Sequence, residues 1–82
     1  MKSKWSFVSS MNGLLCRYQG QVKAVVRQNK AGLHEFATVA PTGAVGRDGY
    51  IRFPTEPEGA PRSALYFHNL GLMLSQALKL EA

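Results

Sequence analysis

The chain has one cysteine and no long apolar run. Cys16 stands alone, which excludes an intramolecular disulfide and gives no sign of a disulfide-stapled secreted scaffold. No apolar stretch approaches the roughly 20 residues that a helix needs to cross a bilayer. The start, "MKSKWSFVSSMNGLLC", has the lysines and the cysteine of a lipoprotein signal, but serines, Asn12 and Gly13 interrupt its apolar part. We therefore expect a cytoplasmic protein that is not attached to a membrane.

Residues that would form a metal or catalytic site are also missing. His34 and His68 lie at no metal-ligand spacing from each other, from Cys16 or from a pair of acids. The glycine-rich residues 43–49 lack the lysine and hydroxyl residue that end a phosphate loop. We interpret both histidines as structural, Cys16 as a core thiol and residues 43–49 as a glycine turn. The sequence predicts no enzyme, no metal and no cofactor.

Acidic residues are absent from the first 34 residues, which contain six lysines and arginines. Residues 35–82 contain four such cations and all five acids. The net charge of +5 therefore comes from the first part of the chain. A basic half of this kind predicts affinity for a polyanion, although it does not specify a fold.

At 82 residues, the chain predicts one domain, residues 1–82, with a thin core. A hydrophobic content of 45% is normal for a folded protein, whereas 18% charged residues is slightly low for a solvated monomer. This composition predicts a folded domain that shares some apolar surface with a partner.

The first turn signal is Asn12-Gly13, the strongest two-residue hairpin signal in the chain. A turn there pairs Met11 with Leu14, and the strands before and after it become antiparallel neighbours. The expected apolar face of this hairpin consists of Trp5, Phe7, Met11, Leu14, Cys16 and Tyr18.

The second turn is expected as a three-residue loop over residues 18–20, with Gly20 in the left-handed conformation. This loop pairs Cys16 with Val22 and Leu14 with Ala24. On the next strand, the side chains expected to face the core are Val22, Ala24 and Val26.

A third loop, residues 30–32, pairs Val26 with Phe36 and Arg27 with Glu35. The second of these is an opposite-charge pair across the strands. A register shifted by one residue would bury the Glu35 carboxylate, which argues against it. The three turns together predict an antiparallel meander with strands at about 4–11, 14–18, 21–29 and 33–40.

Residues 41–61 hold all four prolines and read as a long loop, with a short strand expected within residues 50–53. Residues 62–80 predict a helix, for which Ser63 is a plausible N-cap. At about 100° per residue, the apolar side chains of this helix fill an arc of roughly 200°, wider than contact with one sheet requires. The expected fold is α+β, with four strands followed by a helix that is buried on two sides.

Cations on the sheet face opposite the helix are the first candidate site. Lysine and arginine neutralise phosphates, and exposed aromatic rings stack on bases, so this face predicts binding of nucleic acid without sequence specificity. The alternative for this face is an ordinary solvated surface whose charges keep the protein soluble. For the whole protein, the alternative is a phage or mobile-element module, an inhibitor or adaptor that binds a larger host protein. The candidate nucleic-acid contacts are Arg17, Lys23, Arg27, Lys30, Arg47 and Arg52.

The helix is the second candidate site, because its apolar arc exceeds what one sheet can cover. A homodimer seam would bury the rest, and a small domain with a thin core gains stability from such a partner. In the alternative, residues 41–61 fold back over the helix and cover it. The candidate interface residues are Leu65, Gly71, Leu72 and Leu78.

Overall fold

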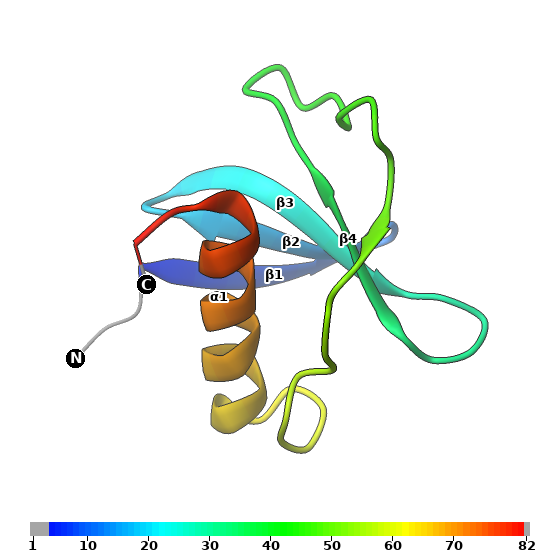
Figure 1. The fold of residues 1–82 in the computed structure, drawn as a ribbon. Helices are drawn as coiled ribbons and strands as arrows, with labels where there is room; N and C mark the ends of the chain where they lie inside the picture. The colour runs from blue at the N-terminus through cyan, green and yellow to red at the C-terminus, as the bar shows by residue number, and fades with distance from the viewer. Residues whose placement is uncertain (1–3, 82) are drawn as a thin grey trace.

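The structure, a computed structural model, describes residues 4–81, so Lys2 of the basic half lies outside it. The chain forms β1 (Trp5–Ser10), β2 (Gly13–Tyr18), β3 (Gln21–Gln28), β4 (His34–Thr38), β5 (Ile51–Arg52) and α1 (Ala64–Leu78). The strands make one antiparallel sheet in chain order, and α1 crosses one of its faces (Figure 1). The predicted α+β meander with a C-terminal helix is confirmed. β5, within the expected residues 50–53, adds a fifth strand to it.

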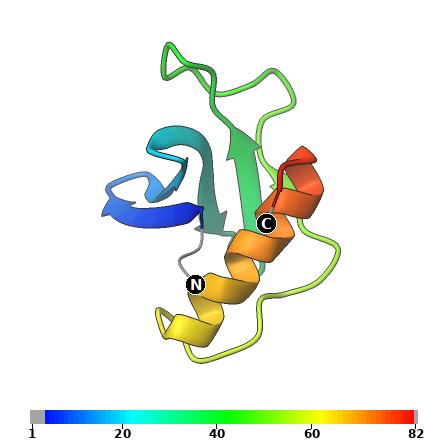
Figure 2. The ribbon, with the colours of Figure 1, turned by 90° about the vertical axis from the view of Figure 1, so that its left-hand side faces the viewer.

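The core lies between the sheet and α1, because alternate side chains of each strand point toward the helix. Leu70 and Leu74 of α1 are fully buried in this layer. Figure 2 shows α1 on one side of the curved sheet and residues 41–50 extending from the end of β4. The buried core consists of Trp5, Leu14, Cys16, Tyr18, Ala24, Val26, Phe36, Phe53, Leu70 and Leu74.

α1 is shorter at both ends than the predicted span of 62–80. Ser63 is the N-cap, as expected: its φ is −77° and its hydroxyl accepts a hydrogen bond from the backbone N–H of Tyr66. The helix ends where Lys79 takes the left-handed conformation, with φ at 56°. Within residues 4–81, no helix has the length and apolar character needed to cross a membrane.

The first hairpin corrects the predicted turn. Met11 and Asn12 form the turn, and Ser10 pairs with Gly13. Gly13 is the first residue of β2, and this position requires glycine because a side chain would collide with β3. A Cβ there would lie 2.5 Å from the carbonyl oxygen of Val26. The pairing is shifted by two residues from the expected one, so the apolar face is unchanged except that Met11 is fully exposed at the turn.

The second hairpin also differs from its prediction. Gln19 and Gly20 form a two-residue turn, with φ values of 51° and 83°. Cys16 pairs with Ala24 rather than Val22, and a β-bulge between Cys16 and Arg17 absorbs the extra residue of β3. Val22 therefore pairs with Arg17 on the face away from α1, whereas Ala24 and Val26 face the core as predicted.

The third hairpin has the predicted register. Val26 pairs with Phe36 and Arg27 with Glu35 across β3 and β4. The side-chain oxygen of Asn29 accepts hydrogen bonds from the backbone N–H groups of Ala31 and Leu33, which orders the turn.

Residues 53–61 cover the second side of α1. Phe53 is buried, with its ring centroid 4.6 Å from that of Phe36. The side-chain amide of Asn69 donates a hydrogen bond to the carbonyl oxygen of Glu58 at 3.3 Å. Gly59 comes so close to the helix that a Cβ on it would lie 2.8 Å from the backbone nitrogen of Tyr66. The helix is thus buried on two sides, as predicted, and the chain itself supplies the second cover.

Candidate nucleic-acid interface

A groove of about 780 Å³ runs along the sheet face opposite α1. Leu15 pairs with Val25, and Val25 with Ala37, so this face of β2, β3 and β4 has an apolar floor. The loop after β4 forms the wall, because Val39 and Val45 extend the sheet as an isolated β-bridge. The residues that line the groove include Leu15, Val22, Val25, Arg27, Val39, Thr42, Val45 and Tyr50.

The β-bulge brings two predicted cations to one end of this groove. Arg17 pairs with Val22, which lines the groove, and Lys23 is the extra residue beside it. The carbonyl oxygen of Lys23 accepts a hydrogen bond from the backbone N–H of Val39, which places Lys23 next to the wall. Neither side chain has an acidic partner among residues 4–81. A phosphate could therefore approach both cations without displacing a carboxylate.

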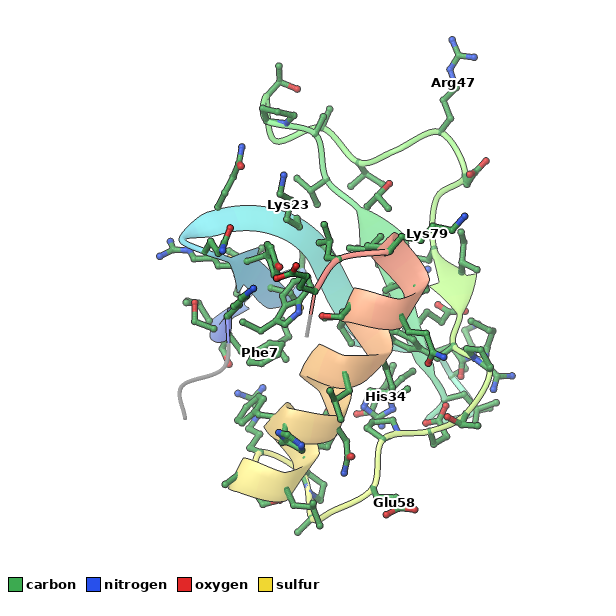
Figure 3. The ribbon with its side chains drawn as sticks, turned by 60° about the vertical axis from the view of Figure 1, so that its left-hand side comes forward. Phe7, Lys23, His34, Arg47, Glu58 and Lys79 are labelled. Atoms are coloured by element: carbon green, nitrogen blue, oxygen red, sulfur yellow. The ribbon has the colours of Figure 1, made fainter. Side chains whose placement is uncertain are left out.

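Arg47 lies in the wall segment, and Figure 3 shows it extending toward the same end of the molecule as Lys23, away from Glu58. The surrounding glycine segment does not resemble a phosphate loop, because the backbone N–H groups of its three glycines already donate hydrogen bonds within the chain. The backbone N–H groups of Gly43, Gly46 and Gly49 donate to the carbonyl oxygens of Ala40, Thr38 and Gly46. The interpretation of residues 43–49 as a turn is therefore supported, and Arg47 contributes through its side chain alone.

Arg27 and Arg52 lie elsewhere in the groove region, each beside a carboxylate. Arg27 Nε is 3.1 Å from Glu35 Oε1, as the predicted register required. Arg52 pairs with Glu35 across β4 and β5, and its Nη2 is 3.8 Å from Glu56 Oε2. Each cation is already partly neutralised, so both are weaker candidates for phosphate contacts than the charge count suggested.

Lys30 is not part of this grouping. It lies in the turn between β3 and β4, seven residues from Lys23, which corresponds to roughly 20 Å along an extended strand. The six predicted cations therefore separate into Arg17 and Lys23 at one end of the groove, Arg47 in the wall segment, Arg27 and Arg52 beside acids, and Lys30 at the far turn.

His34 forms a polar cluster that the sequence did not reveal. Its Nδ1 lies 2.7 Å from Glu56 Oε1 and its Nε2 lies 2.6 Å from the Tyr66 hydroxyl. Its backbone N–H donates to both oxygens of the same carboxylate at 3.1 Å. A carboxylate only accepts, so Nδ1 carries the proton in the assignment that satisfies the network, and Nε2 accepts from Tyr66. The cluster joins β4, the 53–61 segment and α1; no sequence motif links residues 34, 56 and 66.

The contacts of this cluster change the pKa of Glu56. Burial opposes the charged carboxylate, but the hydrogen bonds from the His34 ring and backbone outweigh it, and the pKa of Glu56 lies below its ordinary value of 4.5. His34 is buried with both ring nitrogens occupied, in agreement with a structural role.

Cys16 and His68 offer no site. Cys16 is completely buried, and its desolvation raises the pKa of the thiol to about 12, so it behaves as a core residue. His68 is exposed on α1. Within the described part of the chain, no three histidine, cysteine or acidic side chains are grouped so that they could hold a metal ion.

The fold buries part of the predicted helix interface, so fewer of its residues are available to a partner. Gly71 is buried within the chain, where a Cβ would lie 3.3 Å from a ring carbon of Trp5, so it cannot contact a partner. Leu78 is partly buried against the core. Leu65 and Leu72 remain outside, 54% and 43% exposed. Of the four predicted interface residues, these two are open to a second protein.

Comparison of the chain with known protein families, with curated proteins and with solved structures finds no match. The groove and the cations near it are therefore the features of the molecule that bear on its function.

Proposed function

We propose that this chain is a small basic protein that binds nucleic acid, without sequence specificity, through the groove on the outer sheet face. One observation carries the proposal: Arg17 and Lys23 lie next to Val22 at one end of the groove, Arg47 lies in the loop that forms its wall, and none of the three has an acidic partner among residues 4–81. Three of the five acids are paired with Lys4, Arg27 and the His34–Arg52 group. The charge excess is therefore concentrated on cations that are free to meet phosphates.

Recognition would be independent of sequence because the groove floor is apolar. Sequence is read through hydrogen bonds to base edges, whereas contacts to phosphates position a nucleic acid without reading it. Leu15, Val22 and Val25 supply apolar contact area and no side-chain hydrogen bonds. The proposal is for a cytoplasmic binding role, with no catalytic step and no cofactor.

The test is titration of labelled 20-nucleotide single strands and matched duplexes with the protein, followed by fluorescence anisotropy at several salt concentrations. The double variant Arg17→Glu/Lys23→Glu should bind at least tenfold more weakly at low salt. The slope of log affinity against log salt should fall by about 1.4 for single strands, because each lost phosphate contact accounts for about 0.7.

Lys30→Glu/Lys79→Glu is the matched control, since it makes the same change in net charge at residues that lie in the far turn and at the end of α1. This control should keep most of the affinity. Absence of binding by the wild-type protein at micromolar concentration would refute the proposal. Equal losses in the two double variants would show that net charge, and not the groove, drives the association.

The apolar floor of the groove also favours a second function, a module that binds a larger host protein, such as a phage or mobile-element inhibitor or adaptor. An interface core of this kind is typically apolar with a polar rim. Pull-down from a lysate, repeated after nuclease treatment, separates the two functions. A protein that stays bound after nuclease treatment, and that Arg17→Glu/Lys23→Glu releases, would favour the module.

A further inference from the structure

Arg27 is held in a stack with an aromatic ring inside the groove. Its guanidinium carbon lies 3.5 Å from the centroid of the Tyr50 ring. The Glu35 carboxylate accepts a hydrogen bond from Arg27 Nε at 3.1 Å, which also restrains the guanidinium. The Arg27 side chain nevertheless remains 48% exposed, and both Arg27 and Tyr50 line the groove. Tyr50 therefore covers one face of the Arg27 guanidinium, while a large part of the Arg27 side chain remains exposed to a ligand.

The charges around this stack nearly cancel. Arg27 and Arg52 are the cations, and Glu35 and Glu56 are the carboxylates, with contacts at 3.1 Å and 3.8 Å. A phosphate would meet as much negative as positive charge here. Near the bulge, by contrast, Arg17 and Lys23 face no acid within the described residues. The two ends of the groove thus suit different parts of a nucleotide.

We propose that Arg27 and Tyr50 form a stacking platform for a base of single-stranded nucleic acid, while Arg17, Lys23 and Arg47 hold the phosphates. This inference rests on the proposed function and names its ligand class. A duplex keeps its bases stacked on one another, so it cannot offer a free base face to the platform. A single strand can, and stacking tolerates any base because each has a π-face.

The chemistry of arginine supports this role. A guanidinium is planar, stacks on aromatic rings and is weakly hydrated, whereas a lysine ammonium is a compact and strongly hydrated charge. The Glu35 contact and the Tyr50 ring hold the guanidinium in one orientation before any ligand arrives. The neighbouring floor of Leu15 and Val25 can cover the edge of a bound base. Preorganisation of this kind lowers the entropy cost of binding.

The test compares a 12-nucleotide dT strand with a 12-unit abasic strand of the same length and charge, by competition against a labelled strand. The wild-type protein should prefer the dT strand about tenfold or more, within the range measured for stacking on one side chain. Arg27→Lys keeps the charge but removes the flat group, so it should lose most of this preference. Its salt slope should stay unchanged, because the phosphate contacts are intact.

Arg52→Lys is the matched control, because it makes the same substitution beside the stack and should keep the preference. Tyr50→Phe retains a ring and should behave as wild type, whereas Tyr50→Ala should resemble Arg27→Lys. Circular dichroism of each variant checks that it is folded, and Arg27→Lys alone suffices if Tyr50→Ala unfolds.

Equal binding of dT and abasic strands would overturn the stacking platform and leave the proposed function standing. An Arg27→Lys protein that retains the wild-type preference for the dT strand would overturn the stacking platform in the same way. Failure of both strands to bind would instead remove the proposed function.

Discussion

At Gly13, the backbone of β2 leaves no room for a side chain against β3. Its φ is 135°, and an added Cβ would lie 2.5 Å from the carbonyl oxygen of Val26. Gly13→Ala should therefore lower the free energy of unfolding by about 3–4 kcal/mol, because it adds a steric clash with backbone atoms to the strain of an unfavourable φ. Urea unfolding followed by circular dichroism measures this loss.

Gly32→Ala is the control for that prediction. Gly32 also has a positive φ, 81°, but no atom lies within 4 Å of its expected Cβ. Its substitution should cost only about 1–2 kcal/mol, the cost of placing a side chain in the left-handed region. Equal losses at the two glycines would show that the approach of β2 to β3 is looser than the structure indicates.

Some contacts of single residues could be predicted and others could not. The Arg27–Glu35 pair followed from the sequence because a short loop fixes which residues of a hairpin lie opposite one another. The contacts of Tyr50 and Glu56 did not, because both belong to a long segment with no hydrophobic periodicity. The stacking of Arg27 on Tyr50 and the hydrogen bonds of His34 could therefore not be predicted from the sequence.

Among the elements, the 53–61 segment and α1 are both tied to β4 by His34. Glu56 binds the His34 backbone and ring, and Tyr66 of α1 binds the other ring nitrogen. Ordering a long loop costs conformational entropy, and this cluster supplies contacts that offset it. It also holds the chain near β5, which contains Arg52 and directly follows Tyr50 of the groove.

Acid should weaken this connection. The pKa of Glu56 is lowered in the folded protein, so its charge stabilises the fold above the ordinary value of 4.5. That contribution is lost as the pH falls through the folded-state pKa. Glu56→Gln should therefore be less stable than wild type at pH 7, and the difference should shrink as the pH falls below 4.5.

Thermal unfolding of the two proteins across this range measures the difference. Glu58→Gln is the control, since Glu58 lies in the same segment and has no ion pair among the described residues. A constant difference between wild type and Glu56→Gln from pH 7 to 3 would contradict the role of the Glu56 charge.

The strand faces were predictable to a greater extent than the strand registers. Side chains alternate with a period of two. The first hairpin, and the second hairpin from Leu14 to Cys16, are shifted by two residues, so most inward residues stayed inward. The registers failed because Gly13 is needed within β2, against Val26, and because a bulge lies at Arg17. Both features depend on how neighbouring strands fit together, and no turn motif in the sequence indicates them. Val22 moved to the groove as a consequence.

For the whole molecule, the composition of α1 still favours a partner. Residues 64–78 contain no lysine, arginine, aspartate or glutamate. A helix with one face in water usually carries charged residues there. Leu65 and Leu72 lie seven residues apart, two turns along the same side of the helix, and both are exposed. A second copy of this chain would bury this stripe, away from the groove that lines the opposite sheet face.

We therefore expect a dimer mass from light scattering of the wild-type protein, and a thermal midpoint that rises with protein concentration. Leu65→Glu/Leu72→Glu should give the mass of one chain and remove the concentration dependence, because four buried charges would face one another across the seam. Val8→Glu/Ile51→Glu, at side chains that are each 42% exposed, is the matched control and should leave the dimer intact. A single-chain mass for the wild-type protein at high concentration would rule out the seam. In that case, the segment 53–61 alone accounts for the breadth of the apolar arc.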